Sequence, residues 1–297
     1  MLRRSRVPRR WGRVPAWVFA LVMVMAGAVF PLSAGAAKSV GASPVGPKRY
    51  YLALGDSVAY GYQPNLDLNH GYAEQWFAND LSNKGTQTLV NYACPTETST
   101  TFITGGCRYH FMVHDFYIGS QLNAAVSFIK AHPGQVSPVT LDLGANDLLQ
   151  DFDTANCTVD STAWNRDVNA YSQNLTTILS ALSDALASKQ GRTGDLIVMN
   201  YYNPYQNQCF GSGLDTAYYT QQLNNLIAQR AAQYNVPVAD VYTAFGSGPS
   251  NTHNWQLCVE TWKCTWRDDI HPSGGQFLEP GNGYGIIAAT FRATIGY

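Results

Sequence analysis

Short apolar runs alternate with longer amphipathic stretches from about position 50 to the C-terminus. The apolar runs predict strands at 50–54, 88–92, 138–143, 195–200 and 236–241. Apolar residues spaced three and four positions apart predict helices at 72–83, 121–131, 164–189, 216–234 and 284–294. Alternating strands and helices are typical of a parallel sheet that is covered on both faces. We therefore expect a single α/β domain at 49–297.

Polar residues follow the predicted strands at their carboxyl ends, which is where open parallel sheets bind ligands. Ser57 follows the first strand, Thr96 the second and Asn146 the third. A fourth polar segment, 268–271, follows the last strand after a long loop. Because the carboxyl ends of parallel strands meet at one edge of the sheet, we expect a single site there.

A serine, a histidine and a carboxylate in these segments form the pattern of a nucleophilic hydrolase. The hydroxyl of Ser57 needs a base that accepts its proton, and His271 can be that base near pH 7. A carboxylate at the other ring nitrogen fixes the orientation of the imidazole. Asp268 and Asp269 both precede the histidine, and the spacing of three favours Asp268 at Nδ1, with Nε2 facing Ser57. The pattern predicts a serine ester hydrolase.

Three motifs resemble the sequence blocks of the GDSL family, also called SGNH hydrolases: Gly55-Asp56-Ser57, Gly144-Ala145-Asn146-Asp147 and Asp268-Asp269-Ile270-His271. The resemblance runs from about residue 50 to the C-terminus and implies a three-layer sandwich around a flavodoxin-like parallel sheet. It implies Ser57 as nucleophile, His271 as base and Asp268 as the residue that orients the base. It also implies an oxyanion hole made by the backbone N–H groups of Ser57 and Thr96 and the side chain of Asn146. No metal or cofactor is implied.

The chain departs from the family pattern at two places. Thr96 stands where the family usually has a glycine, and a β-branched residue is unfavourable at positive φ. Either the loop adopts a different backbone shape, or the backbone donor at this position is lost. The segment 272–282 also lengthens the connection from the histidine to the last helix, so we expect it at the rim of the pocket.

The first 37 residues have the pattern of a secretory signal peptide. Six arginines precede an apolar run at 14–32, and small residues follow at 34–36. The alternative is an uncleaved membrane anchor, since the apolar run is nearly long enough to span a bilayer. We expect cleavage, a flexible mature N-terminus at 38–48, and a secreted extracellular protein that keeps no stable membrane anchor.

Removal of this leader changes the charge of the protein. The whole chain has 19 basic and 20 acidic residues, and the leader contains six of the basic residues and none of the acidic ones. The mature chain would therefore have 13 basic and 20 acidic residues, a net charge of −7. This balance argues against binding of nucleic acid.

Six cysteines lie behind the predicted leader, and an even number in a secreted chain indicates disulfides. Six cysteines allow many pairings; we expect neighbours to pair in order, as Cys94–Cys107, Cys157–Cys209 and Cys258–Cys264. A metal site is the alternative, but no pair has the Cys-x-x-Cys spacing and no histidines cluster with the cysteines.

The sequence predicts a monomeric carboxylic ester hydrolase of the lipase or esterase type, which acts on a lipid or a small acyl ester. Aromatic residues near the predicted strand ends could line an acyl pocket or fill surface grooves: Tyr60, Tyr62, His110, Tyr117, Tyr202 and Tyr205. Three alternatives remain open. The chain could remove acetyl groups from a polysaccharide, transfer an acyl group to an alcohol, or bind an extracellular ligand without catalysis.

Overall fold

The computed structural model describes residues 43–249 and 252–297. The predicted leader at 1–37 lies outside the described residues, as does the first part of the segment expected to be flexible at 38–48. The end of that segment is attached to the domain, because the N–H groups of Val45 and Gly46 donate to the carboxylate of Asp195 at 3.0 and 2.9 Å. Asp195 is almost fully buried and needs such donors, so the attached chain begins earlier than predicted.

Five parallel strands form the central sheet in the order β2-β1-β3-β8-β9. This is the order of flavodoxin-like sheets. The predicted parallel sheet is confirmed, and each of the five predicted strands is present, at slightly different bounds. The strands are β1 (Tyr50–Gly55), β2 (Thr88–Asn91), β3 (Val136–Asp142), β8 (Leu196–Met199) and β9 (Val238–Ala239).

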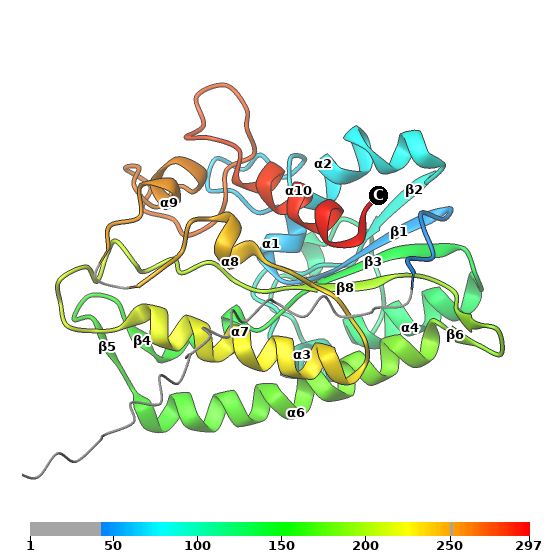
Figure 1. The fold of residues 1–297 in the computed structure, drawn as a ribbon, viewed down its shortest axis with the longest axis horizontal. Coiled ribbons are helices and arrows are strands. Elements are labelled where there is room, and N and C mark those ends of the chain that lie inside the picture. Colours follow the sequence, from blue (N-terminus) through cyan, green and yellow to red (C-terminus); the bar gives the residue numbers. More distant parts are fainter. Residues whose placement is uncertain (1–42, 250–251) are drawn as a thin grey trace, which may run out of the picture. The chain divides into compact units, whose positions relative to one another are not determined.

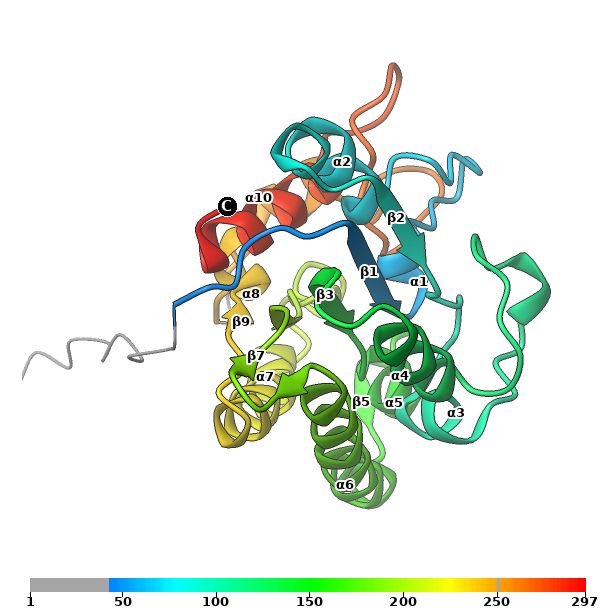
Figure 2. The same ribbon diagram turned by 90° about the vertical axis from the view of Figure 1, so that its right-hand side faces the viewer.

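Helices cover both faces of the sheet and complete the predicted three-layer sandwich (Figures 1 and 2). On one face lie α2 (Tyr72–Asn79) and α10 (Gly283–Ile295). On the other face lie α4 (Gln121–Ala131), α6 (Ser161–Ala185) and α7 (Thr216–Gln233). The shorter helices are α1 (Ser57–Tyr60), α3 (Ser99–Thr104), α5 (Ala145–Leu148), α8 (Val241–Ala244) and α9 (Trp255–Glu260), with 3-10 turns η1 (Leu81–Lys84), η2 (His110–Met112) and η3 (Leu149–Asp151). Two small hairpins complete the fold: β4 (Phe152–Asp153) with β5 (Thr158–Val159), and β6 (Ala187–Ser188) with β7 (Gly191–Arg192).

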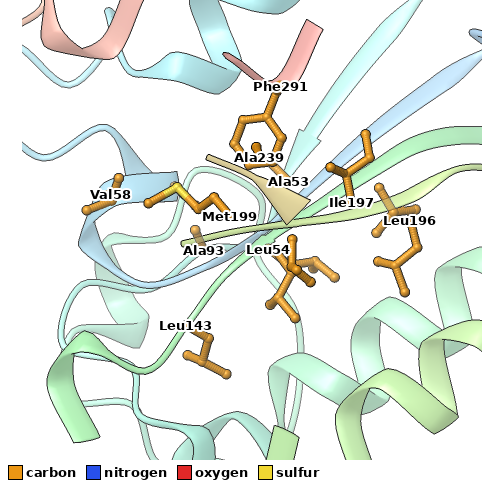
Figure 3. Packing of buried hydrophobic residues seen from close by; sticks show 14 of the residues in the cluster. Ala53, Leu54, Val58, Ala93, Leu143, Leu196, Ile197, Met199, Ala239 and Phe291 are labelled. Carbon is orange, nitrogen blue, oxygen red and sulfur yellow. The ribbon is translucent and has the colours of Figure 1, made fainter. Parts of the chain in front are cut away.

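The hydrophobic core lies on both faces of the sheet, because successive side chains of a strand point to opposite sides. In β8, Leu196 points to the face of α6, and Ile197 points to the face of α10 (Figure 3). Small side chains of β1 and β9, Ala53 and Ala239, leave room for the ring of Phe291 from α10. The sheet thus gives a rigid support to the loops that follow its strands.

Helix α6 is shifted from the prediction of 164–189, because a polar cap sets its start and a hairpin follows its end. Asp160 caps the N-terminus by accepting hydrogen bonds from the N–H groups of Thr162 and Ala163, both at 3.0 Å. At the other end, the chain leaves the helix after Ala185 and forms the β6–β7 hairpin. Apolar periodicity marked the middle of this helix correctly and its ends less well.

The three expected disulfides are all formed: Cys94–Cys107, Cys157–Cys209 and Cys258–Cys264. The first holds the loop that follows β2, and the third holds the segment that follows α9. Both of these segments lead into the candidate active site. In the described part of the chain, no helix is long and apolar enough to cross a membrane.

Candidate active site

The turn after β1 exposes the side chain of Ser57 at the carboxyl edge of the sheet. Gly55 has φ 137°, and a Cβ there would lie 2.0 Å from the carbonyl oxygen of Asp142, so only glycine fits this turn. Asp56 then caps α1 by accepting a hydrogen bond from the N–H of Val58 at 2.9 Å. Ser57 is consequently the first residue of α1, where a backbone N–H has no partner within the helix.

His271 connects this serine to a carboxylate. Its Nε2 lies 2.8 Å from Oγ of Ser57, and its Nδ1 lies 2.6 Å from Oδ1 of Asp269. The same carboxylate oxygen accepts the backbone N–H of His271 at 2.9 Å. The edge of the imidazole packs against the ring of Tyr62, with the ring centres 4.7 Å apart. The histidine is therefore held on three sides, with Nε2 aimed at the hydroxyl.

The carboxylate at the imidazole is Asp269, which corrects the prediction of Asp268. The side chain of Asp268 is 68% exposed and forms an ion pair with Nζ of Lys263 at 2.8 Å. The segment is a turn and not a helix, with Asp268 in the left-handed region at φ 46°. In this turn the carboxylate two residues before the histidine reaches both its ring and its backbone, and the carboxylate three residues before it points outward.

Asp269 places a negative charge next to the imidazole of His271. Partial burial raises the pKa of Asp269, but the hydrogen bonds and charge of His271 outweigh burial and leave the pKa below its ordinary value. The carboxyl is therefore ionised at neutral pH. An ionised carboxylate at Nδ1 keeps the proton on that nitrogen and leaves Nε2 free to accept one from Ser57.

The loop that follows β2 keeps the backbone shape of a glycine although it contains a threonine. Thr96 has φ 71°, in the left-handed region that β-branched residues rarely adopt. The N–H of Glu97 donates to the carbonyl of Cys94 at 3.0 Å, and the Cys94–Cys107 disulfide closes this loop. The structure therefore follows neither alternative expected from the sequence: the loop keeps the glycine-like backbone with threonine in place, at a local cost of about 1–2 kcal/mol.

Asn146 extends from α5 towards the same loop. Gly144 precedes α5 with φ 127°, and a Cβ there would lie 2.6 Å from the ring of Tyr171. One N–H of the Asn146 amide donates to the carbonyl of Glu97 at 3.0 Å, which leaves its second N–H available. Ser57, Thr96 and Asn146, the three predicted oxyanion donors, all line one cavity.

Substitution of Asn146 should lower turnover without unfolding the protein. We expect Asn146→Ala to reduce kcat about 10²–10³-fold on any ester, because one preorganised donor to the developing oxyanion is lost. KM and the melting temperature should change much less. Asn169→Ala, which removes an exposed amide from α6, is the matched control and should leave kcat unchanged. A kcat for Asn146→Ala equal to the wild-type value would contradict the proposed oxyanion role.

Buried carboxyl groups lie beneath and beside the nucleophile turn, and two of them, Asp142 and Glu97, lie outside the motifs that the sequence analysis singled out. Asp142 accepts the N–H of Ala59 at 3.1 Å and the hydroxyl of Tyr72 at 3.1 Å, and its carboxyl also hydrogen-bonds that of Asp56. Burial raises the pKa of both acids, of Asp142 most strongly. A carboxyl group at the end of the otherwise uncharged strand β3 was the available signal in the sequence.

Glu97 is the second such group and adjoins the predicted oxyanion loop. Its Oε2 accepts a hydrogen bond from Gln121 at 2.9 Å, whereas its buried Oε1 has no partner. Burial raises its pKa to about 7 from an ordinary 4.5. Near neutral pH the folded protein therefore holds a proton that an unfolded chain releases.

This difference predicts how stability changes with pH. Between pH 4.5 and 7 the folded state binds more protons than the unfolded state at Glu97, so the free energy of unfolding falls as pH rises and then levels off. Glu97→Gln mimics the neutral acid and cannot ionise. We expect the wild type to lose about 1–3 kcal/mol more than the variant between pH 5 and pH 8.

Urea unfolding of both proteins at the two pH values measures this effect. Asp147, whose pKa burial raises to about 6, contributes to the pH dependence of both proteins and cancels in the comparison. The same pH dependence in the wild type and in Glu97→Gln would show that Glu97 is ionised at neutral pH in the folded protein.

A cavity of about 460 Å³ opens beside Ser57 and His271. Its walls come from the loops after β1, β2, β3 and β8, from the segment 269–271 and from the N-terminal halves of α6 and α7. Of the aromatic residues that the sequence singled out, Tyr62, Tyr202 and Tyr205 line this cavity. Tyr60 instead stacks on His114, with ring centres 4.5 Å apart, and His110 packs against Tyr117.

One group of side chains has the spacing of metal ligands in the described part of the chain: Cys94, Glu97 and Cys107. The two cysteines are joined in a disulfide, so their sulfur atoms are not thiolates that could bind a metal ion. This group therefore has the wrong chemistry for a metal centre.

The sheet order and the serine–histidine–aspartate geometry define an α/β hydrolase of the SGNH type. Residues 53–274 match the GDSL-like Lipase/Acylhydrolase family, and the chain belongs to this family. No curated protein matches the sequence.

Solved structures share the fold at low sequence identity. Lip_vut3, a lipase from a goat rumen metagenome, has 17% identity and a TM-score of 0.58, over 82% of this chain and 96% of its own. Axe2, an acetylxylan esterase from Geobacillus stearothermophilus, has 16% identity and a TM-score of 0.53, over 86% and 97%. LAE5, an α/β hydrolase enzyme from the metagenome of Lake Arreo, has 18% identity and a TM-score of 0.51, over 86% and 98%. At these identities the likeness shows the fold alone.

Proposed function

We propose that this protein is a serine carboxylic ester hydrolase in which Ser57 is the nucleophile, His271 the general base and Asp269 the residue that orients the base. The observation that carries the proposal is the continuous contact from Oγ through both ring nitrogens to an ionised carboxylate, at 2.8 and 2.6 Å. This chain of contacts lines a largely apolar cavity, which suits an acyl group.

The reaction would proceed in two halves. Oγ of Ser57 forms a bond to the ester carbonyl carbon as Nε2 of His271 takes the hydroxyl proton, and the carbonyl oxygen becomes an oxyanion. The N–H groups of Ser57 and Thr96 and the free amide N–H of Asn146 would stabilise that charge. The imidazolium then protonates the leaving alkoxide as its bond to carbon breaks. Water repeats the sequence on the acyl-enzyme and releases the acid.

A covalent probe that reacts with activated serines tests this proposal for any ester substrate. A fluorophosphonate should label the wild-type protein at Ser57, as located by mass spectrometry, and labelling should be lost after heat denaturation. A non-catalytic binding protein would not react with the probe. Failure to label a protein that hydrolyses no p-nitrophenyl ester would overturn the proposed function.

We also propose that the enzyme acts outside the cell. The arginine-rich leader with its apolar run predicts secretion, and the three disulfides suit an oxidising compartment. Cell fractionation of a producing culture tests this: the enzyme should be found in the medium, with an N-terminus near residue 37 or 38.

A further inference from the structure

One wall of the cavity offers carbon surface and few polar groups. It is formed by the buried side chains of Leu148, Trp164 and Leu223, from α5, α6 and α7. The polar atoms that reach this wall are already used by the protein. The indole N–H of Trp164 donates to Gln222 at 2.8 Å, and the hydroxyl of Thr220 donates to the carbonyl of Thr216 at 2.9 Å.

The hydroxyl groups of two further cavity residues, both tyrosines, are also bonded to the protein. The hydroxyl of Tyr201 donates to Asp56 at 3.3 Å, and that of Tyr202 donates to the carbonyl of Ile270 at 2.5 Å. Both side chains line the cavity and keep their hydroxyl groups bonded to protein. Sugar hydroxyls placed here would lose their hydrogen bonds to water and find few new partners, which is costly. The wall therefore favours an apolar chain over a carbohydrate.

The size of the cavity fits a chain much longer than an acetyl group. A methylene group occupies close to the volume of a water molecule in the liquid, about 30 Å³. A cavity of about 460 Å³ thus has room for an acyl chain on the order of ten carbons beside the reacting ester. An acetyl group would leave most of this space without contacts.

Large apolar side chains are also exposed on the two loops that border the site. Leu66 lies four residues after the cavity residue Tyr62, and Trp266 lies four residues before the cavity residue Ile270. Phe277 and Leu278 belong to the long connection before α10. The exposed fractions of Leu66, Trp266, Phe277 and Leu278 are 73%, 86%, 91% and 84%.

Hydrogen bonds hold these loops beside one another, and Figure 2 shows them side by side. The amide of Asn65 donates to Glu279 at 2.7 Å, and the guanidinium of Arg267 donates to the carbonyl of Pro64 at 2.6 Å. Leu66 and Leu278 both have left-handed backbones, at φ 64° and 73°. Each leucine combines an unfavourable backbone with an exposed apolar side chain, so folding gains little from having leucine at either position.

We propose that the substrate is a neutral or zwitterionic lipid ester taken from an aggregated lipid surface, with its acyl chain in the cavity and with Leu66, Trp266, Phe277 and Leu278 seated in that surface. The inference rests on the proposed ester hydrolase function and adds the substrate class and the way it is reached. The segments that carry Leu66 and Trp266 also contribute Tyr62 and Ile270 to the cavity, so a lipid surface seated on them would lie next to the site. The net charge of −7 expected after leader removal disfavours an anionic surface.

Chain-length dependence tests the cavity. With p-nitrophenyl esters from acetate to decanoate, kcat/KM of the wild type should rise about fourfold per added methylene until the cavity is filled. Leu223→Phe should lower the ratio of decanoate to acetate activity at least about tenfold, by reducing the volume. Ile227→Phe changes a core residue one turn further along α7 that does not line the cavity, and should leave the ratio unchanged.

The outcomes distinguish the lipid inference from the proposed ester hydrolase function. Acetate as the best substrate, with activity falling as the chain lengthens, would overturn the lipid inference while keeping the ester hydrolase. Equal ratios of decanoate to acetate activity in Leu223→Phe and wild type would mean that the acyl chain does not lie beside Leu223. Absence of activity on every ester would instead count against the proposed function.

Flotation with phosphatidylcholine vesicles tests the surface contact independently of catalysis. All proteins would carry Ser57→Ala, so that the lipid is not consumed. Replacement of Phe277 and Leu278 by serine should weaken vesicle binding about 10²-fold, since two large apolar side chains no longer leave water. Tyr218→Ser removes an exposed aromatic from α7, on the opposite face of the sheet from α10, and should bind like the parent.

The parent protein, which carries Ser57→Ala alone, is expected to float with neutral vesicles. A parent protein that stays at the bottom of the gradient, or a double variant that floats equally well, would overturn the surface contact. Stronger flotation of the parent with anionic vesicles would contradict the charge argument. None of these results depends on whether Ser57 is the nucleophile.

Discussion

Ser57→Ala should lower ester hydrolysis at least about 10⁴-fold, the order of loss seen when a member of a catalytic triad is removed. The reason is chemical: without Oγ, no acyl-enzyme forms, and His271 has no hydroxyl from which to take a proton. Hydrolysis of p-nitrophenyl butyrate by the purified mature protein, beside the wild type, measures the effect. Residual activity above about one hundredth of the wild type would exclude Ser57 as nucleophile.

The fold should survive this substitution, because Ser57 is only partly buried and its side chain bonds only His271 among the described residues. The melting temperature of Ser57→Ala should match that of the wild type. Ser82→Ala is the matched control: its hydroxyl bonds the carbonyl of Ala78 on the surface, and its loss should leave activity unchanged. Loss of activity in both variants would point to impaired folding and not to a missing nucleophile.

Asp269→Asn should lower kcat about 10³–10⁴-fold, whereas Asp268→Asn should change it by less than about threefold. An amide at 269 cannot stabilise the imidazolium and favours the wrong tautomer of His271, whose Nδ1 lies 2.6 Å away. Asp268 is largely exposed, and its carboxylate pairs with Lys263 and not with the imidazole. Steady-state kinetics of the two isosteric variants on one ester makes the comparison.

The pair of variants also provides its own control, since both remove one negative charge from adjacent positions. Loss of activity in Asp268→Asn with little change in Asp269→Asn would restore the prediction from sequence spacing. It would also require a different turn at 268–271 from the one in the structure. Equal, small effects would mean that the enzyme relies on serine and histidine alone.

The pattern of apolar residues predicted the layers of the fold well, and the ends of the elements less well. A buried strand such as β3 or a long amphipathic helix such as α6 carries its periodicity in the local sequence. Ends are set by single polar contacts, such as the cap at Asp160, or by turns such as the β6–β7 hairpin. These depend on which groups lie within reach after folding.

The order of the motifs along the chain also predicted where the candidate site lies. The motifs that contain Ser57 and Asn146 follow strands of a parallel sheet, so their convergence at one edge follows from the topology of the sheet and needs no particular side-chain contact. The glycine-like conformation of Thr96 could not be obtained in this way. It depends on a loop that is closed by a disulfide and by the contact of its Glu97 carbonyl with Asn146.

The sequence by itself determined the α/β class and the serine and histidine that meet at the edge of the sheet. These properties depend on local periodicity and on the order of segments, which the linear chain contains. The tertiary structure alone decided that Asp269 and not Asp268 contacts the imidazole, that buried acids lie under Ser57, and that the cavity beside them is largely apolar. Each of these depends on the direction in which a side chain leaves a turn, and long-range packing sets that direction.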